Sequence, residues 1–157
     1  MVGPGAWDLG LGAWESADRT EGDDAMQQKN GFRDLRVWQT GMDLLVEMYT
    51  LARQLPAEEK YGLCSQIRRA AVSIPSNIAE GYNRLQPKVH RQFLYNALGS
   101  CAELETQVEA ACLLGYVDEQ HTDRYVTELV RQSRMLRKLA LTIDERSGTQ
   151  DSAPGTW

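Results

Sequence analysis

The sequence predicts an all-α domain, an antiparallel up-down-up-down four-helix bundle. Three observations support this fold class. Apolar residues recur at steps of three and four through most of the chain, as on the buried face of amphipathic helices. Residues 30–148 contain no Val/Ile/Thr-rich alternating run with hairpin turns. The links between the helical segments are short, so consecutive helices are expected to lie antiparallel and to cross at about 20°.

A proline separates the first two predicted helices. The first spans about residues 35–54 and stops at Pro56, because proline disfavours helical backbone in the residue before it. The second begins near Glu58. The residues expected to face the core are Trp38, Met42, Leu45, Met48 or Tyr49, Ala52 and Leu55 in the first helix, and Ile67, Ala70, Ala71, Ile74 and Ile78 in the second.

Capping residues delimit the third and fourth helices. The third spans about residues 87–114, with Pro87 in its first turn and Gly115 at its C-terminal cap. Asp118 is the predicted N-cap of the fourth. The residues expected to face the core are Leu94, Ala97, Leu98, Cys101, Leu104, Val108 and Ala111 in the third helix, and Tyr125, Leu129, Gln132, Leu136, Leu139 and Ile143 in the fourth.

The chain divides into one domain and two tails. Residues 1–29 are rich in Gly, Asp and Glu and have no sustained apolar period, which predicts a disordered acidic extension. Residues 30–148 form the predicted bundle, and residues 149–157 read as a disordered tail. Residues 1–28 hold six acidic residues and one basic residue, whereas residues 29–148 hold sixteen basic and fifteen acidic residues. The formal net charge of -5 therefore does not argue against a nucleic-acid partner for the domain.

Cysteine usage and hydropathy indicate a cytoplasmic protein. Cys64, Cys101 and Cys112 form no CxxC pair and fall within helical patterns, where a cysteine packs as a small apolar residue. No apolar stretch is long enough to span a bilayer, and the N-terminus lacks the order of a signal peptide. A reducing compartment and no membrane partner are expected.

One segment, residues 73–82, breaks the helical rules. Pro75 lies inside an apolar helical pattern, where it removes a backbone donor and costs about 3 kcal/mol. Ser73, Ser76 and Asn77 could satisfy the freed backbone or reach a facing helix. The segment is either a kinked core helix or a subunit interface whose polar network fixes register. The interface hypothesis names Ser73, Pro75, Ser76, Asn77, Glu80 and Tyr82.

The same segment resembles a known family. The string Ser-Ile-Pro-Ser-Asn-Ile-Ala-Glu-Gly-Tyr at 73–82 is similar to the four-helix-bundle proteins encoded by intervening sequences in bacterial 23S rRNA genes. The other matching positions are Tyr61-Gly62-Leu63, Gln66 to Ala71, Phe32, Leu35, Val37-Trp38, Phe93-Leu94, Gly99-Ser100, Glu103 to Glu105 and Leu114-Gly115-Tyr116. The resemblance covers about residues 31–146.

This resemblance implies a closed bundle that assembles as a homopentamer and has no assigned catalytic residue. The accessory variability protein of diversity-generating retroelements is a more distant match to the same bundle type. The role of that accessory protein is similar to that of a protein that binds RNA and a reverse transcriptase. The resemblance therefore implies RNA or a nucleic-acid enzyme as a partner of this chain. That relation is an analogy of fold.

The predicted topology gathers basic residues at one end of the bundle. The start of the first helix, the link between the second and third, and the end of the fourth meet there. The basic residues are Arg33, Arg36, Arg84, Lys88, Arg91, Arg137, Lys138 and Arg146, and the acidic ones are Asp34, Glu80, Asp144 and Glu145. The helix dipole explains basic residues at helix C-termini, but not Arg33, Arg36, Lys88 and Arg91 before or inside first turns. Phosphate binding is the alternative explanation. The opposite end is predicted to be acidic: Arg53, Lys60 and Arg124 face Glu58, Glu59, Glu109, Asp118, Glu119 and Asp123.

The residues that would support catalysis or metal binding are not arranged for it. His90 and His121 lie near opposite ends of the predicted bundle, and neither has a carboxylate or cysteine at ligand spacing on its own helix. Ser73 and Ser76 have no nearby histidine to act as base. The sequence predicts no metal, no cofactor, no small-molecule substrate and no enzymatic activity. It favours an oligomeric RNA-associated adaptor; the alternative is a protein-protein interaction scaffold that binds no nucleic acid.

Overall fold

The structure is a computed structural model, and it describes residues 31–148. The elements, in chain order, are the 3-10 helix η2 (Gly31–Asp34), α1 (Arg36–Gln54), the 3-10 helix η3 (Ala57–Lys60), α2 (Leu63–Tyr82), α3 (Pro87–Leu113) and α4 (Glu119–Gly148). No strand occurs within this described range. The predicted all-α class with four main helices is confirmed. The predicted tails lie outside the described residues.

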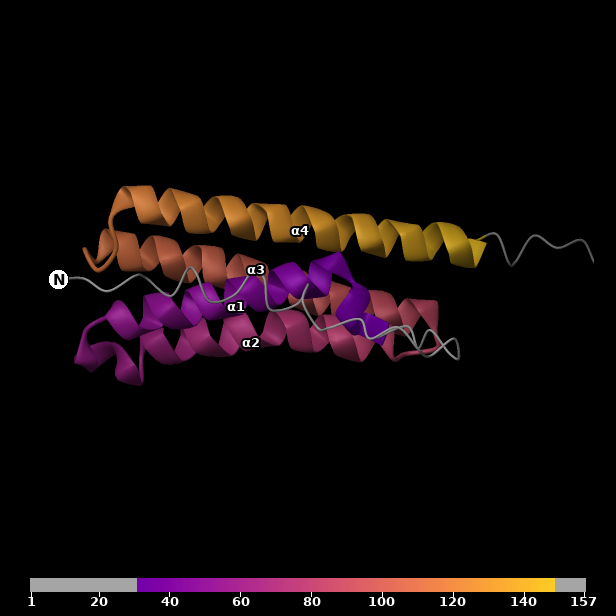
Figure 1. Ribbon diagram of the computed structural model, residues 1–157, viewed down its shortest axis with the longest axis horizontal. Coiled ribbons are helices and arrows are strands. Elements are labelled where there is room, and N and C mark those ends of the chain that lie inside the picture. Colours follow the sequence, from indigo (N-terminus) through magenta and orange to yellow (C-terminus); the bar gives the residue numbers. More distant parts are fainter. Residues whose placement is uncertain (1–30, 149–157) are drawn as a thin grey trace, which may run out of the picture.

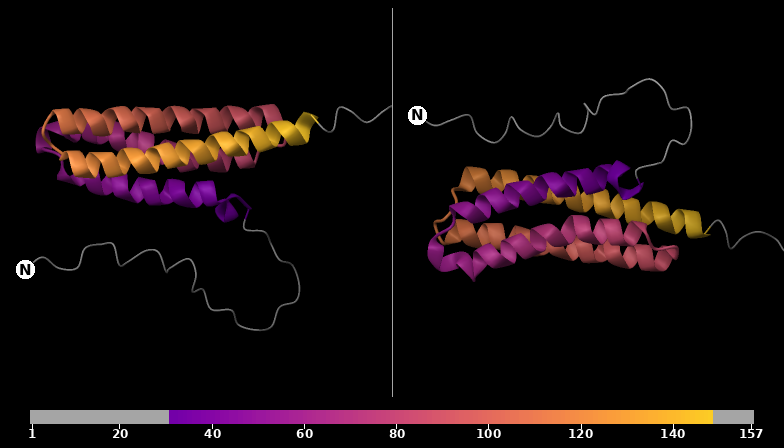
Figure 2. Two further views of the ribbon diagram at one scale, coloured as in Figure 1. Left: turned by 90° about the horizontal axis from the view of Figure 1, so that it is seen from above. Right: turned by 60° about the horizontal axis from the view of Figure 1, so that its bottom comes forward.

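The four helices lie side by side in a slim bundle (Figures 1 and 2). Each helix packs against the next one along the chain, and α1 also contacts α4. In Figure 1 the α1–α2 and α3–α4 links lie at the left-hand end. The α2–α3 link and the start of α1 lie at the right-hand end, where α4 extends beyond the other helices.

Local chemistry sets the limits of α3 and α4 as the sequence predicts. Gly115 has a φ of 76°, and the backbone N–H of Tyr116 donates to the carbonyl of Ala111 at 2.9 Å, which closes the end of α3. The Asp118 carboxylate accepts a hydrogen bond from the backbone N–H of His121 at 2.8 Å. Asp118 is therefore the N-cap of α4.

The predicted start of the second helix near Glu58 is wrong. Residues 57–60 form the separate element η3, and α2 begins at Leu63. Gly62, with φ −96° and ψ −117°, interrupts the helical backbone. The Glu59 carboxylate reaches past this break and accepts a hydrogen bond from the backbone N–H of Leu63 at 2.9 Å. The acidic residue therefore caps α2 from outside it.

One core contains most of the predicted inward residues. In α2, α3 and α4 the expected positions are buried or packed against the core. In α1 the register differs by one residue. Val37, Gly41, Leu44, Met48 and Leu51 face inward, whereas Trp38, Met42, Leu45 and Tyr49 are half-buried. The expectation for Met42 and Leu45 is therefore wrong, whereas Trp38 is half-buried and packs against the core. Met48, Ala52 and Leu55 are buried as expected.

Glycine explains the register of α1. A Cβ at Gly41 would lie 3.3 Å from both Ile74 Cγ2 and Gln132 Nε2. Because Gly41 has no side chain, α1 approaches α2 and α4 closely at this position. That contact turns Val37, Leu44, Met48 and Leu51 toward the core.

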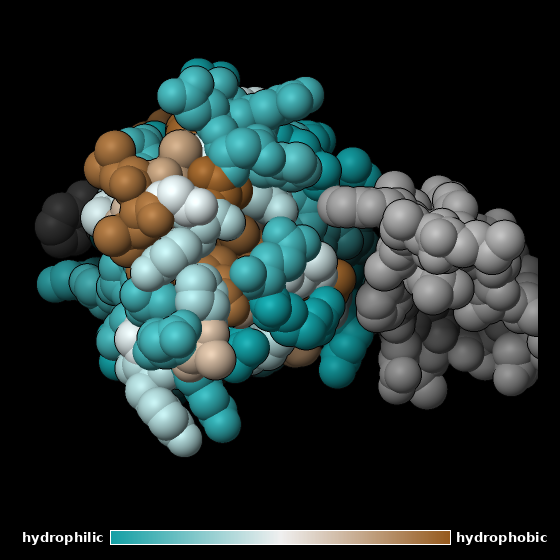
Figure 3. Space-filling view, turned by 90° about the vertical axis from the view of Figure 1, so that its left-hand side faces the viewer, coloured by the Kyte–Doolittle hydropathy of each residue, from teal (hydrophilic) through white to brown (hydrophobic). Residues whose placement is uncertain are grey.

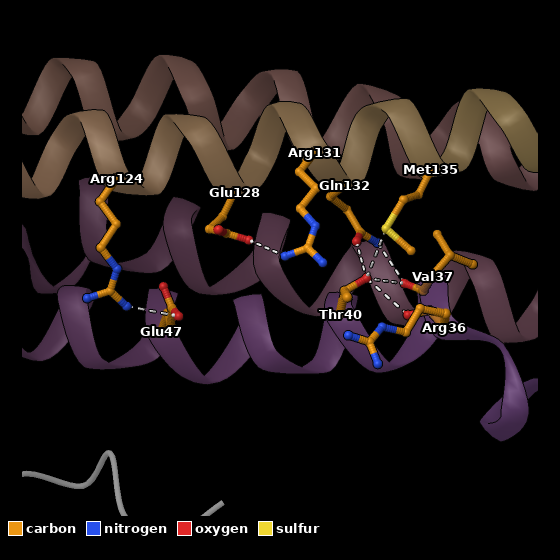
Figure 4. Close-up of polar contacts among 9 residues, drawn as sticks. All are labelled: Arg36, Val37, Thr40, Glu47, Arg124, Glu128, Arg131, Gln132 and Met135. Atoms are coloured by element: carbon orange, nitrogen blue, oxygen red, sulfur yellow. Dashed lines mark hydrogen bonds and ion pairs between the residues drawn. The ribbon is translucent and has the colours of Figure 1, made fainter. Parts of the chain in front are cut away.

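A buried glutamine joins α1 to α4 (Figure 4). Gln132 is only 1% exposed, and its Nε2 donates to the carbonyl of Val37 at 2.8 Å. The Thr40 hydroxyl donates to Gln132 Oε1 at 2.5 Å. Both ends of the amide are satisfied, as a buried polar group requires. Farther along the same pair of helices, Arg124 forms an ion pair with Glu47 at 3.1 Å.

Candidate nucleic-acid interface

The predicted basic residues of the nucleic-acid site lie on four elements. Arg33 is in η2 and Arg36 is the first residue of α1, and both are exposed. Arg84 is exposed in the α2–α3 link, and Lys88 is exposed in the first turn of α3. These four residues lie on segments that meet at the right-hand end in Figure 1. We call this end, with Arg33, Arg36, Arg84, Lys88 and Arg91, the basic end.

The two basic residues of α4 lie farther from the tip of that helix than the prediction implied. Arg137 and Lys138 are exposed and precede the last residue of α4 by eleven and ten positions, which corresponds to roughly 15 Å along the axis. They follow Gln132 and Met135, which contact Thr40 at the start of α1. They are thus beside the start of α1 rather than at the end of α4. The side chain of Arg146 lies outside the described residues.

Two of the predicted phosphate-binding residues form ion pairs within the chain. Arg84 pairs with Glu80 at 2.5 Å, and Arg91 pairs with Asp144 of α4. The pair with Asp144 gives Arg91 a structural reason to occupy the first turn of α3 despite the helix dipole. Arg91 therefore no longer requires a phosphate to explain its position.

Aromatic rings support two arginines at the basic end. The Arg33 guanidinium carbon lies 4.7 Å from the centroid of the Phe32 ring, and that of Arg84 lies 5.2 Å from the Phe93 centroid. These distances fit cation–π contacts. The stacked Arg33 guanidinium keeps its N–H donors available to an anion, whereas the Arg84 guanidinium already donates to Glu80.

The predicted oligomer-interface segment makes its clearest contacts inside the subunit. α2 runs without a break through Pro75, which is buried. The Ser100 hydroxyl of α3 donates to Ser73 Oγ at 2.8 Å, and the Asn77 amide donates to the carbonyl and hydroxyl of Ser73 at 2.8 and 2.9 Å. The expectation that these polar groups reach a facing helix is confirmed for Ser73.

The rest of that segment has mixed surroundings. Ser76 is exposed, Glu80 is exposed beside Arg84, and Tyr82 is partly exposed. At Gly81 the helix α2 comes very close to α3, because a Cβ there would lie 2.8 Å from Phe93 Cβ and 3.1 Å from the His90 carbonyl oxygen. A role in subunit contacts stays a prediction.

Neither histidine forms part of a metal site in the described chain. His121 Nδ1 lies 2.7 Å from Asp118 Oδ2, so the expectation that no carboxylate on its own helix would reach it is wrong. The N-cap position places the carboxylate beside the ring. His90 Nε2 is buried without a hydrogen-bond partner, and burial lowers the pKa of His90. Across residues 31–148 no three His, Cys, Asp or Glu side chains are grouped so as to hold a metal ion.

The cysteines of the described chain are free thiols. Cys64 and Cys101 are buried, and Cys112 is half-buried. Burial raises the pKa of the Cys101 thiol to about 11. Since the thiolate is the nucleophile, Cys101 is inert at neutral pH, as its place on the apolar stripe predicts.

The fold defines the class of this protein as a four-helix bundle whose described helices include none long and apolar enough to cross a membrane. The model of the 23S rRNA-intervening sequence protein family matches residues 33–138. This match spans most of the bundle, and the chain belongs to that family.

One solved structure shows the same fold. It is the crystal structure of a protein of unknown function from the S23 ribosomal protein family of Bacteroides thetaiotaomicron, with a TM-score of 0.62 and 21% sequence identity. The similarity covers 66% of this chain and 97% of the other. At this identity it supports the fold alone. Comparison with curated proteins gave no match.

Proposed function

We propose that this protein is a non-enzymatic, cytoplasmic RNA-associated adaptor that works as a homo-oligomer of up-down-up-down bundles. The observation that carries the proposal is the set of exposed cations at the basic end. Arg36 and Lys88 are exposed, and within the described chain neither side chain forms an ion pair or hydrogen bond. Both lie where a helix N-terminus disfavours a positive charge. Binding of phosphate oxygens accounts for cations held at such positions.

Oligomerisation would increase the attraction of this end for RNA. The family resemblance implies a pentamer, and a ring with cyclic symmetry would bring every basic end to one rim. A rim of repeated positive charge attracts phosphates over a longer range than a single patch does. The Arg33 guanidinium, already held against Phe32, would then need little further ordering to bind.

The test replaces Arg36 and Lys88 with glutamine and measures binding to short single-stranded and duplex RNA over a series of salt concentrations. Arg36→Gln with Lys88→Gln is expected to weaken binding. It is also expected to reduce the slope of log K against log salt by about 0.7 to 0.9 for each lost phosphate contact. Arg91 is left intact because its removal would leave Asp144 without this partner.

The matched control removes the same two charges from the other end of the bundle. Arg53 and Lys60 are exposed near the α1–α2 link. Arg53→Gln with Lys60→Gln is expected to leave the salt slope unchanged. Equal affinities for both double variants, with the oligomer intact, would contradict the RNA proposal.

The alternative function is a protein-protein interaction scaffold that binds no nucleic acid. The specific observation in its favour is the neutralisation of two arginines at the basic end by Glu80 and Asp144. Such a scaffold would show no RNA binding at low salt, and its affinity for a protein partner would depend only weakly on ionic strength.

A further inference from the structure

The left-hand end of the bundle in Figure 1 exposes large apolar side chains. Leu113, the last residue of α3, is 89% exposed, and Leu114 beside it is 57% exposed. Tyr61, between η3 and α2, is 86% exposed. Figure 3 views this end directly and shows apolar surface gathered on one part of it, with hydrophilic residues around it. We call Leu113 and Leu114 the end patch.

The backbone beneath the end patch is held in place by specific contacts. The Tyr116 hydroxyl donates to Glu59 Oε1 at 3.2 Å, which ties the α3–α4 link to η3. The other oxygen of Glu59 caps the first turn of α2. Gly115, with its φ of 76°, closes α3 directly after Leu114. The two leucines are thus presented on an ordered turn, so little order would be lost when a partner binds.

Exposed acidic residues lie at the same end of the bundle as the end patch. Glu58, Glu119 and Asp123 are exposed, and none of the three forms an ion pair in the part of the chain that the structure describes. Asp118 and Glu59 add negative charge, although both also serve as caps. Across this end three basic residues stand against six acidic ones. The end patch therefore lies in a negative field that repels RNA and attracts cations.

The fold restricts how a protein segment could bind here. Residues 31–148 contain no strand, so no sheet edge is available to add a strand from a partner. An amphipathic helix with basic flanks matches both the exposed leucines and the acidic residues of this surface. Its apolar stripe covers the leucines, while its lysines and arginines face the acidic residues. An anionic or purely polar segment would satisfy neither.

We propose that the end patch and the acidic residues at the same end form a docking site for a cationic amphipathic helix of another protein. This site lies at the end of the bundle opposite the basic end. The protein would then hold RNA at one end and a protein partner at the other. The docking site does not depend on RNA binding, because it uses none of the same residues.

The test measures binding of a synthetic helical peptide to the full-length chain by fluorescence anisotropy. The probe is about four helical turns long, with leucines at helical spacing and lysines on the flanks. Two peptides serve as comparisons: one with the same composition in scrambled order, and one with glutamate in place of every lysine. The Leu/Lys helix is expected to bind saturably, and the scrambled and glutamate peptides to bind at least about tenfold more weakly.

Variants locate the binding site. Leu113→Ser with Leu114→Ser is expected to weaken binding of the Leu/Lys helix by about tenfold or more, since it removes the apolar area that the peptide would bury. Leu141→Ser is the matched control, because Leu141 is 62% exposed and lies toward the other end of α4, away from the end patch. Glu58→Gln with Asp123→Asn is expected to weaken binding a few-fold and to reduce its salt dependence.

Three results would overturn the proposal. The first is equal affinity of the wild type and the double leucine variant for the Leu/Lys helix. The second is equal affinity of the wild type for the glutamate peptide. The third is a change of oligomer mass in the double leucine variant, which would make the end patch a contact between copies of this chain. RNA affinity is measured on the same variants and is expected to be unchanged, so failure of the docking site is distinguishable from failure of the RNA proposal.

Discussion

Replacing Gly81 with alanine is expected to destabilise the bundle, although alanine is the better helix former. An added Cβ would lie 2.8 Å from Phe93 Cβ and 3.1 Å from the backbone oxygen of His90. Neither neighbour is the far end of a flexible side chain, so α2 and α3 would have to move apart. Overpacking of this kind costs about 1–3 kcal/mol.

The same substitution at Gly99 provides the matched control. Gly99 lies inside α3 and is exposed, and a Cβ there would meet nothing within 4 Å. Gly99→Ala is therefore expected to stabilise the protein by about 0.8–1 kcal/mol through helix propensity alone. Gly81 is close to the end of α2, so Gly81→Ala gains less from propensity and is expected to lower the free energy of unfolding by about 0.5–2 kcal/mol.

Urea and thermal unfolding followed by circular dichroism measure both changes. For a domain of this size, 1 kcal/mol corresponds to a shift of roughly 3–5 °C in Tm. The two variants are expected to shift Tm in opposite directions. A rise in Tm for both would show that α2 and α3 are not in close contact at Gly81, and the argument from backbone proximity would be wrong.

Four further predictions concern the N-terminal segment, the number of subunits, Asn77 and pH. Deleting residues 1–25 is expected to leave helicity and Tm almost unchanged, because that segment has no buried apolar period; a large loss of stability would move the domain boundary. Light scattering is expected to give a discrete oligomer, with five subunits the number implied by the family resemblance, and a monomer at micromolar concentration would refute it. Asn77→Leu removes the amide that bonds to Ser73, at a cost of roughly 1–3 kcal/mol for each group left unpaired, and unchanged assembly would exclude Asn77 from the interface. Burial lowers the pKa of His90 below the usual histidine value of about 6.5, so the unfolded chain binds the proton more tightly. Stability is then lost as the pH falls below about 6.5, and a His90→Gln variant with the same pH slope would contradict this.

Local signals were sufficient to predict most helix limits. Gly115 and Asp118 act as caps because their effect depends on a few neighbouring residues. The start of α2 was missed because the cap, Glu59, lies four residues before the first helical position and acts across Gly62. The spacing of residues in the sequence does not distinguish a glutamate that caps a helix from outside it from a glutamate inside the first turn.

The register of α1 could not be derived from periodicity. Two rows of apolar residues, offset by one position, run along this helix, and either gives steps of three and four. Gly41 decides between them, because only the absence of a side chain there allows contact with Ile74. A glycine does not count as apolar in a pattern, so the row that contains it looks weaker than it is.

The basic end was predicted from topology, but its ion pairs were not. Arg91 and Asp144 lie 53 residues apart in the sequence, and their pairing depends on the axial position of α4 relative to α3. The topology predicts at which end of the bundle a residue lies, but not this axial position. For the same reason the exposure of Leu113 and Leu114 could not be predicted from the sequence, since only the structure shows that the described chain leaves them uncovered.

The contact between Gln132 and Val37 also determines how α1 can slide. A shift of α1 by one helical turn moves its backbone about 5.4 Å along α4 and carries the Val37 carbonyl out of reach of the amide. The stranded amide would cost roughly 1–3 kcal/mol, and the shift would also place a side chain larger than that of Gly41 against Ile74. The hydrogen bond and the glycine contact thus specify the same level of α1, while apolar burial supplies its attachment. Gln132→Leu would leave only the glycine contact to hold α1 at that level.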